Sequence, residues 1–482
     1  LTEEEARRLL PNWSLLDEQS AGIADGSPFD LAAHCAYGHE MQRHIAFAGA
    51  VLSVRGLTSA DGGLPLKLVH EGMKEVVMHE VGHTLGLRHN FKASTWKSLE
   101  ELDDVEKSKQ EGTVASVMDY SPANIAPTTE QQGLYYTQTI GPYDYWAIEY
   151  AYKPIQGDEK AELAKIAARS GEPGLDYATD EDVEAGDPDP YVNTFDLAKD
   201  PLAFIRRQMQ HTEELIPSVV EKTVEEGEGY QRARQAFGLL VNEYWRAALL
   251  ASRFPGGLSV NRDHKGAENA RPPLAIVDPA VQREAMELIV ASAFASPEYD
   301  GTLLNHLAAT NWSHWGLQAN NRTDYPVHRV VEQFQSLMLT ELISATTFER
   351  ILDNEYKTPA DQDAYTLAEH LDSLVAGVFT EWQVDQPAGQ FTNRQPYINS
   401  MRRNLQRNTL KRLANLVTGT AAVPPDARTL ARFHLSNLGG NIERILAVEG
   451  LTLDDYTRAH LVDCRERIEQ ALSAELRVNS VN

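Results

Sequence analysis

Hydrophobic positions in the first part of the chain recur every three or four residues, which is the period of an α-helix. This spacing predicts one helix over Lys67–Leu85, which no proline interrupts, and another over Ala36–Leu57. Before them, Thr2–Glu5 has the pattern of a capping box and predicts the start of a helix. We find no convincing alternation of apolar and polar residues ahead of Lys67, so this region predicts helices rather than strands.

The same period dominates the end of the chain. Long amphipathic segments, separated by Pro, Gly and Asn, predict a C-terminal helical domain over residues 326–482. These segments are Val327–Tyr356, Ala364–Val384, Tyr397–Val417, Asp426–Glu449 and Leu453–Val478. Residues 151–325 mix helices and loops and predict an extension of the body formed by residues 1–150. There, Glu213–Phe254 is helical with breaks at Pro217 and Gly227–Gly229, and Arg253–Pro273 has the composition of a loop.

The helix predicted over Lys67–Leu85 carries three histidines in the pattern H-E-x-x-H-x-x-G-x-x-H. His79 and His83 are four residues apart, so they lie on one helix face and can bind one ion. Gly86 tolerates the left-handed backbone of a sharp turn, which would bring His89 back as a third ligand. The spacing therefore predicts a zinc site made by three imidazoles.

Glu80 adds a carboxylate to this site. It follows His79 by one residue, about 100° around the helix, so it lies near the metal without having to bind it. Three neutral nitrogen ligands, an open position for water and a nearby base are what a zinc-dependent peptide hydrolase needs. The alternative is a helix with two core histidines and a third in its C-terminal turn.

A second motif lies downstream, at Ser116–Pro122, with the sequence S-V-M-D-Y-S-P. It resembles a Met-turn, and together the two motifs resemble the metzincin clan of zinc endopeptidases. The resemblance implies that Met118 forms an apolar floor under the imidazoles. It also implies that Tyr120 lies near the zinc, where it can ligate the metal or steady the tetrahedral intermediate. Ordinary core packing is the alternative for both residues.

Three phrases sharpen this resemblance: His79–Phe91, Ser116–Ala126 and Gly141–Tyr152. They are similar to phrases in long bacterial zinc-dependent metalloproteases of the Met-zincin type, over about residues 30–350. The resemblance implies a secreted, periplasmic or cell-surface protein that acts on protein or peptide substrates. Asn90 follows the third histidine and differs from the residue found there in the familiar metzincin groups, so we place the chain in none of them.

Metzincins build a twisted sheet before the zinc helix, and the sequence predicts none here. We therefore expect an α+β protein that is predominantly α-helical in this chain. It would be the C-terminal part of a metzincin-like catalytic domain followed by a helical domain. The upstream sheet would be missing or supplied by another chain, such as an N-terminal fragment of the same precursor.

Composition limits the partners. With 44 basic and 70 acidic residues, the formal net charge is −26, which argues against nucleic acid and anionic membranes. The sequence has no apolar run long enough to predict a membrane span. Cys35 and Cys464 could form one bridge between the two ends of the chain, although free buried thiols are the simpler interpretation, and two cysteines do not make a disulfide scaffold. The acidic segment Asp180–Glu184, with Asp187 and Asp189, could hold Ca²⁺, although a solvated acidic loop is the simpler interpretation.

These observations predict a zinc-dependent endopeptidase in which Glu80 is the general base. One rival is a non-catalytic binding or scaffold protein with a structural zinc site, which four protein ligands would usually close. Another is an aminopeptidase-like gluzincin, which takes a later glutamate as its third ligand. The offset of His89 disfavours that second rival.

Overall fold

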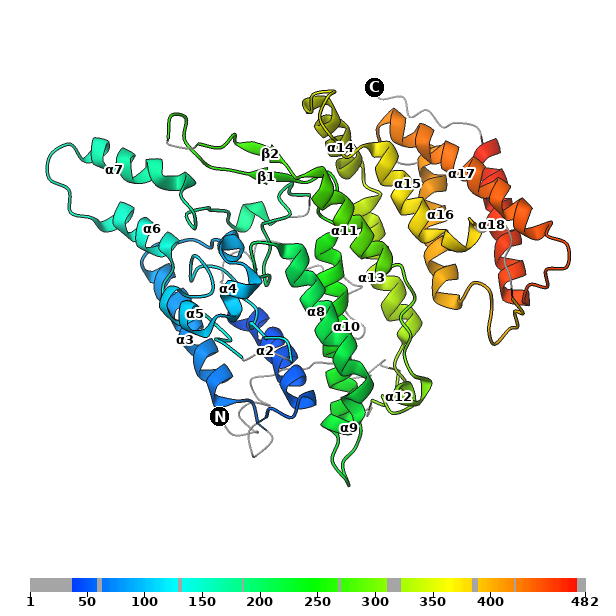
Figure 1. Cartoon of the computed structure of the whole chain (residues 1–482), viewed down its shortest axis with the longest axis horizontal. Coiled ribbons are helices and arrows are strands. Elements are labelled where there is room, and N and C mark those ends of the chain that lie inside the picture. The colour runs from blue at the N-terminus through cyan, green and yellow to red at the C-terminus, as the bar shows by residue number, and fades with distance from the viewer. Residues whose placement is uncertain are drawn as a thin grey trace, which may run out of the picture. The chain divides into compact units, whose positions relative to one another are not determined.

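The computed structural model describes most of the chain, in eight segments. They are residues 37–58, 63–128, 132–183, 186–267, 270–309, 322–383, 389–419 and 422–474. The described residues are mostly helical, and two short strands, β1 (Leu258–Val260) and β2 (Leu274–Ile276), pair with each other (Figure 1). The prediction of a predominantly α-helical chain is confirmed. The capping box at Thr2–Glu5 and Cys35 lie outside the described residues.

The chain divides into two compact units. The first consists of the described parts of Leu1–Ala247, Val260–Ala275 and Tyr299–Tyr325, and it contains all the residues of the predicted zinc site. Its longer helices are α2 (Tyr37–Val54), α3 (Leu66–Thr84), α6 (Pro142–Tyr152), α7 (Glu159–Ala167), α8 (Pro201–Leu215) and most of α10 (Gln231–Ala251). Its shorter helices are α4 (Leu99–Asp103), α5 (Val105–Glu111), α9 (Val219–Thr223) and α12 (Gly301–Asn305).

The helix that carries the metal motif is α3, and its bounds match the prediction closely. It ends in a Schellman motif, in which the N–H of Gly86 donates to His83 O and the N–H of Leu87 donates to Gly82 O. Gly86 has a φ of +82°, the left-handed conformation that glycine adopts without strain. The chain therefore reverses directly after the second histidine.

The second unit consists of Ala248–Ser259, Ile276–Glu298 and the described parts of Pro326–Asn482. It is built from α11 (Pro279–Ala291), α13 (Val327–Leu342), α14 (Ala345–Lys357), α15 (Leu367–Val378), α16 (Ser400–Val417), α17 (Pro425–Leu446) and α18 (Asp455–Ser473). Helices α16, α17 and α18 pack on one another (Figure 1). Each of the three helices carries aliphatic side chains that are almost fully buried, among them Leu405, Leu413, Leu435, Leu438 and Leu461.

Two features differ from the expectation. The segment Val327–Tyr356 forms two helices, because Ser344 caps α14 by accepting a hydrogen bond from Thr347 N at 3.0 Å. The loop predicted over Arg253–Pro273 contains β1.

The break at Pro217 falls in a short 3-10 helix between α8 and α9. No described helix combines the length and hydrophobicity needed to cross a bilayer.

Candidate metal centre

The three motif histidines converge. One ring nitrogen each from His79, His83 and His89 lies within 4.8 Å of the others, and no other group of three or more His, Cys, Asp or Glu in the described residues is placed to share an ion. The first two residues come from α3, and the third follows the reversal at Gly86. The turn therefore brings together three imidazoles from eleven consecutive residues.

His79 is fully buried, and its Nδ1 donates a hydrogen bond to Val117 O at 2.7 Å. Burial lowers its pKa to about 3, so the ring is neutral at physiological pH. With its proton held at Nδ1, the ring presents the lone pair of Nε2. This is the form in which an imidazole binds a metal ion.

His83 is half-buried and has the same arrangement. Its Nδ1 donates to Leu87 O at 3.0 Å, across the turn that ends α3. Its Nε2 is buried and has no hydrogen-bond partner among the described residues. A buried nitrogen without a partner costs free energy, and a bound cation would satisfy it.

His89 completes the group, and a carboxylate orients it. Its Nδ1 lies 2.6 Å from Asp180 Oδ1, and its Nε2 lies 3.1 Å from Tyr120 Oη. Burial lowers the pKa of His89 while Asp180 opposes the shift. Burial opposes ionisation of Asp180, but its contact with His89 and its hydrogen bond with Thr179 together lower the pKa of that carboxyl. All three rings are thus bonded at Nδ1, so Nε2 is the nitrogen that each could present to a metal, and Tyr120 Oη lies beside that of His89.

Met118 packs directly against the metal helix. It is fully buried, and a Cβ added at Gly82 would overlap its Sδ. Glycine at this position therefore lets the sulfur approach the helix between His79 and His83. Met118 O also accepts a hydrogen bond from Asn90 N at 2.9 Å. This bond connects the Met-turn to the residue that follows the third motif histidine.

Asp144 fixes the Met-turn (Ser116–Pro122) through hydrogen bonds. Its carboxylate accepts hydrogen bonds from Ser116 Oγ at 2.6 Å and Val117 N at 3.0 Å. It also accepts from Gly141 N at 2.8 Å, at the start of α6. One buried side chain therefore positions both the helix that follows the turn and the carbonyl of Val117 that orients His79.

Tyr120 and Glu80 differ in their exposure to solvent. Tyr120 is buried, with its ring centroid 4.8 Å from that of His89 and 5.5 Å from that of His79. Glu80 is exposed on α3, directly after the first ligand. The arrangement thus supplies a buried hydroxyl beside His89 and a carboxylate that faces solvent.

The acidic segment around Asp180 is neutralised by basic side chains. Glu181 pairs with Arg88 at 2.6 Å, and Asp182 pairs with Arg262 at 2.6 Å. We call the segment from Gly86 to Lys92 the metal turn. Asp189 pairs with Lys92, a buried lysine of this segment, at 2.8 Å. These carboxylates face cations and His89 rather than a common centre, so the structure does not support the suggested calcium site. Glu184 lies outside the described residues.

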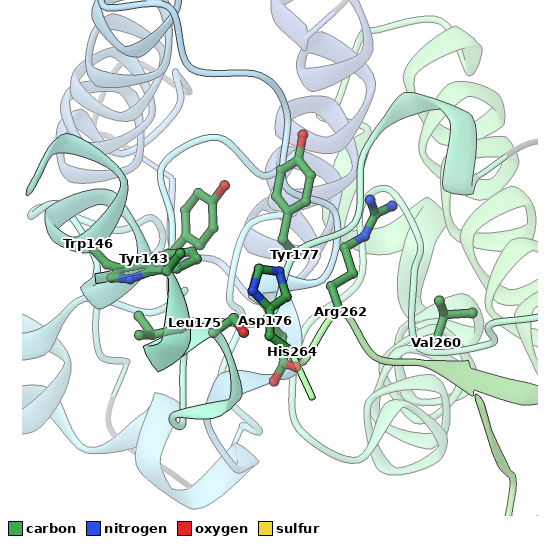
Figure 2. Close-up of a pocket in the computed structure, with 10 residues that line it drawn as sticks. Tyr143, Trp146, Leu175, Asp176, Tyr177, Val260, Arg262 and His264 are labelled. Atoms are coloured by element: carbon green, nitrogen blue, oxygen red, sulfur yellow. The ribbon is translucent and has the colours of Figure 1, made fainter. Parts of the chain in front are cut away.

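Asn90 connects the metal turn to a pocket. Its side chain donates to Asp176 O at 2.9 Å and accepts from Ala178 N at 3.2 Å. Asp176 and Tyr177 also line a pocket of about 190 Å³ (Figure 2). Its walls include Tyr143, Trp146, Tyr177, Arg262 and His264. The rings of Tyr143 and Tyr177 are stacked with centroids 5.6 Å apart, and the Arg262 guanidinium lies 5.2 Å from the Tyr177 ring.

Comparison with known families identifies one match. A family described as Met-zincin matches residues 62–386, which is about two thirds of the chain and includes every residue of the metal centre. No curated protein matches the chain, and no solved structure matches it.

Proposed function

Because the chain belongs to the Met-zincin family of metzincin-clan zinc metalloproteases, we propose that it is a zinc-dependent endopeptidase acting on protein or peptide substrates. The observation that supports this most directly is the shared orientation of His79, His83 and His89, each bonded at Nδ1. Structural zinc sites are usually closed by four protein ligands. The group in the described part of this chain has three.

The Nε2 atoms of the three histidines would hold the ion. Bound zinc supplies an acidified water and withdraws electron density from a peptide carbonyl. The neutral state of His79 at physiological pH fits this role, because a protonated imidazole has no lone pair to donate. Asp180 is the positioning residue for His89, since its carboxylate holds the ring proton at Nδ1.

Glu80 and Tyr120 would then act on the substrate. The Glu80 carboxylate takes a proton from the attacking water and passes it to the nitrogen of the departing amine. Tyr120 Oη, already inside the site, donates a hydrogen bond to the oxygen of the attacked carbonyl as negative charge develops on it. Glu80 is thus proposed as the general base and Tyr120 as the oxyanion donor.

The pocket beside the metal turn is the proposed receptor for a substrate side chain. Its segment Asp176–Ala178 is bonded to Asn90, and Asp180, only two residues further, contacts His89. Aromatic walls and a volume of about 190 Å³ favour an aromatic or long aliphatic side chain. The family likeness further leads us to propose export to the periplasm or cell surface, which fractionation of the producing cells would test.

A peptide-library digest tests the activity. The zinc-loaded protein should cleave internal peptide bonds, a chelator should stop cleavage, and added zinc should restore it. His83→Ala should lose both zinc and activity, as measured by elemental analysis and by the same digest. Cleavage that survives removal of the metal would contradict the proposal.

A further inference from the structure

A polar stripe runs along one face of α16, in the second unit. Its members follow Asn404 at offsets of three, four, seven, eight and eleven residues, so they share one helix face. They are Asn404, Arg407, Asn408, Lys411, Arg412 and Asn415. These side chains line a groove of about 570 Å³, which Glu332 and Ser336 of α13 and Arg467 of α18 complete. We call it the α16 groove.

Cations dominate the walls of the α16 groove. Four basic side chains face one carboxylate, that of Glu332, in a chain whose net charge is −26. Such a concentration of positive charge runs against the composition of the whole protein. It creates a local potential that attracts anions.

The two central guanidinium groups donate to neutral acceptors. Arg407 donates to Asn404 Oδ1 at 2.6 Å and contacts His460 Nδ1 at 3.3 Å. Burial, followed by the charge of Arg407, lowers the pKa of His460 to about 3, so that ring is neutral and contributes no charge to the groove. Arg412 donates to Ser336 O at 3.0 Å and Thr340 Oγ1 at 2.9 Å.

A neighbouring arginine shows the contrast. Arg402 of the same helix is paired with Glu381, whose carboxylate lies 2.8 Å from its Nε. Arg412 is half-buried, and burial lowers its pKa. Among the described residues neither Arg407, Arg412 nor Lys411 forms an ion pair. The fold thus supplies a counter-charge for Arg402 and for Arg467 of the groove, whose Nε lies 2.9 Å from Asp463 Oδ2. It leaves Arg407, Lys411 and Arg412 without one among the described residues.

We propose that the α16 groove binds a multivalent oxyanion, a molecule carrying at least two phosphoryl or carboxylate groups. Guanidinium groups match the geometry of such oxygens, and the asparagine amides add further donors. The stripe from Asn404 to Asn415 is about 16 Å long at 1.5 Å per residue, longer than one phosphate. A single small anion would leave part of it unused. This site is independent of the proposed peptidase activity.

Calorimetric titration of the full-length chain tests the proposal. The probes are inorganic triphosphate, citrate and orthophosphate, each at about 0.15 M salt, where exposed charges are screened beyond about 8 Å. We expect one saturable site for triphosphate or citrate, with orthophosphate at least tenfold weaker. The tighter of the two larger probes identifies phosphoryl or carboxylate as the preferred group. No saturable binding of either, or equal affinity for orthophosphate, would overturn the proposal.

Lys411→Glu locates the site. Lys411 is exposed and has no described hydrogen bond, so the variant should keep the thermal unfolding midpoint of the wild type while binding at least tenfold more weakly. Lys357→Glu, at an exposed lysine outside the groove, makes the same charge change and should bind within twofold of the wild type. Extraction of zinc by the probes would be common to all three proteins and would cancel in the comparison. Equal weakening in both variants, or none in Lys411→Glu, would refute the assignment.

Discussion

Replacing Asp180 by alanine should weaken zinc binding about tenfold while leaving the three ligands in place. The carboxylate lies 2.6 Å from His89 Nδ1 and so favours the ring orientation in which Nε2 would bind the proposed ion. Without it, His89 can rotate or hold its proton at Nε2, and either change removes one donor from the site. The variant therefore tests orientation rather than the ligand set.

The structure sets the size of this effect. Loss of a partner that orients a metal ligand typically costs 10- to 100-fold in metal affinity. The Asp180 side chain is 49% exposed, so solvent screens the contact and water can replace part of it. We therefore expect the lower end of the range, about tenfold or about 1.4 kcal/mol of binding free energy.

Competition with a chromophoric zinc chelator at fixed pH measures the affinity. Glu181→Ala is the matched control, because it removes the neighbouring carboxylate and its contact with Arg88 but does not touch His89. Its zinc affinity should stay within about twofold of the wild type. Equal losses in the two variants would show a general charge effect, and an unchanged affinity in Asp180→Ala would refute the positioning role.

Three further predictions follow from single side chains. Glu80→Gln should keep stoichiometric zinc by elemental analysis but lower kcat/KM for peptide cleavage by about 10²- to 10⁴-fold, and undiminished cleavage would exclude Glu80 as the base. Gly82→Ala should reduce the free energy of unfolding in urea by about 1–3 kcal/mol, because the new methyl overlaps Met118 Sδ; a net gain, reflecting helix propensity alone, would contradict the packing. His370 is fully buried, and burial lowers its pKa to about 4. The contribution of its neutral ring to the free energy of unfolding is therefore present above pH 6.5 and is lost as the pH falls towards 4. The loss at pH 5 is about 2 kcal/mol. Urea unfolding at pH 7 and pH 5 should show a smaller pH dependence in His370→Gln than in the wild type, and parallel curves would refute this.

The convergence of the three histidines could be predicted because their geometry is local. His79 and His83 are one helical turn apart, and Gly86 marks the reversal that brings in His89. The carboxylate that orients His89 lies 91 residues away, in an acidic run that resembles any solvated loop. Nothing in the spacing of Asp180 identifies its partner, since that contact depends on how the chain folds back.

The helix α3 shows both the strength and the limit of periodicity. Its bounds follow from the apolar spacing, yet Met73, Val77 and Val81 are 59%, 60% and 50% exposed. The buried face instead carries His79 and Gly82, because imidazoles must converge there and the sulfur of the Met-turn must approach closely. Hydrophobic period predicts the helix but does not determine its orientation when chemistry occupies the inner face.

The segment Asp176–Asp182 is attached to the metal turn through Asn90, His89 and Arg88. Such attachments are reciprocal: if the ion steadies His89, it also steadies this segment, and its departure weakens both. In a metal-free molecule, the segment Asp176–Asp182 would then be less firmly held and more accessible to cleavage by a zinc-loaded molecule. In a working peptidase, metal-free molecules would then be cleaved by zinc-loaded molecules in preference to other zinc-loaded molecules. The molecules that remain would be mostly zinc-bound.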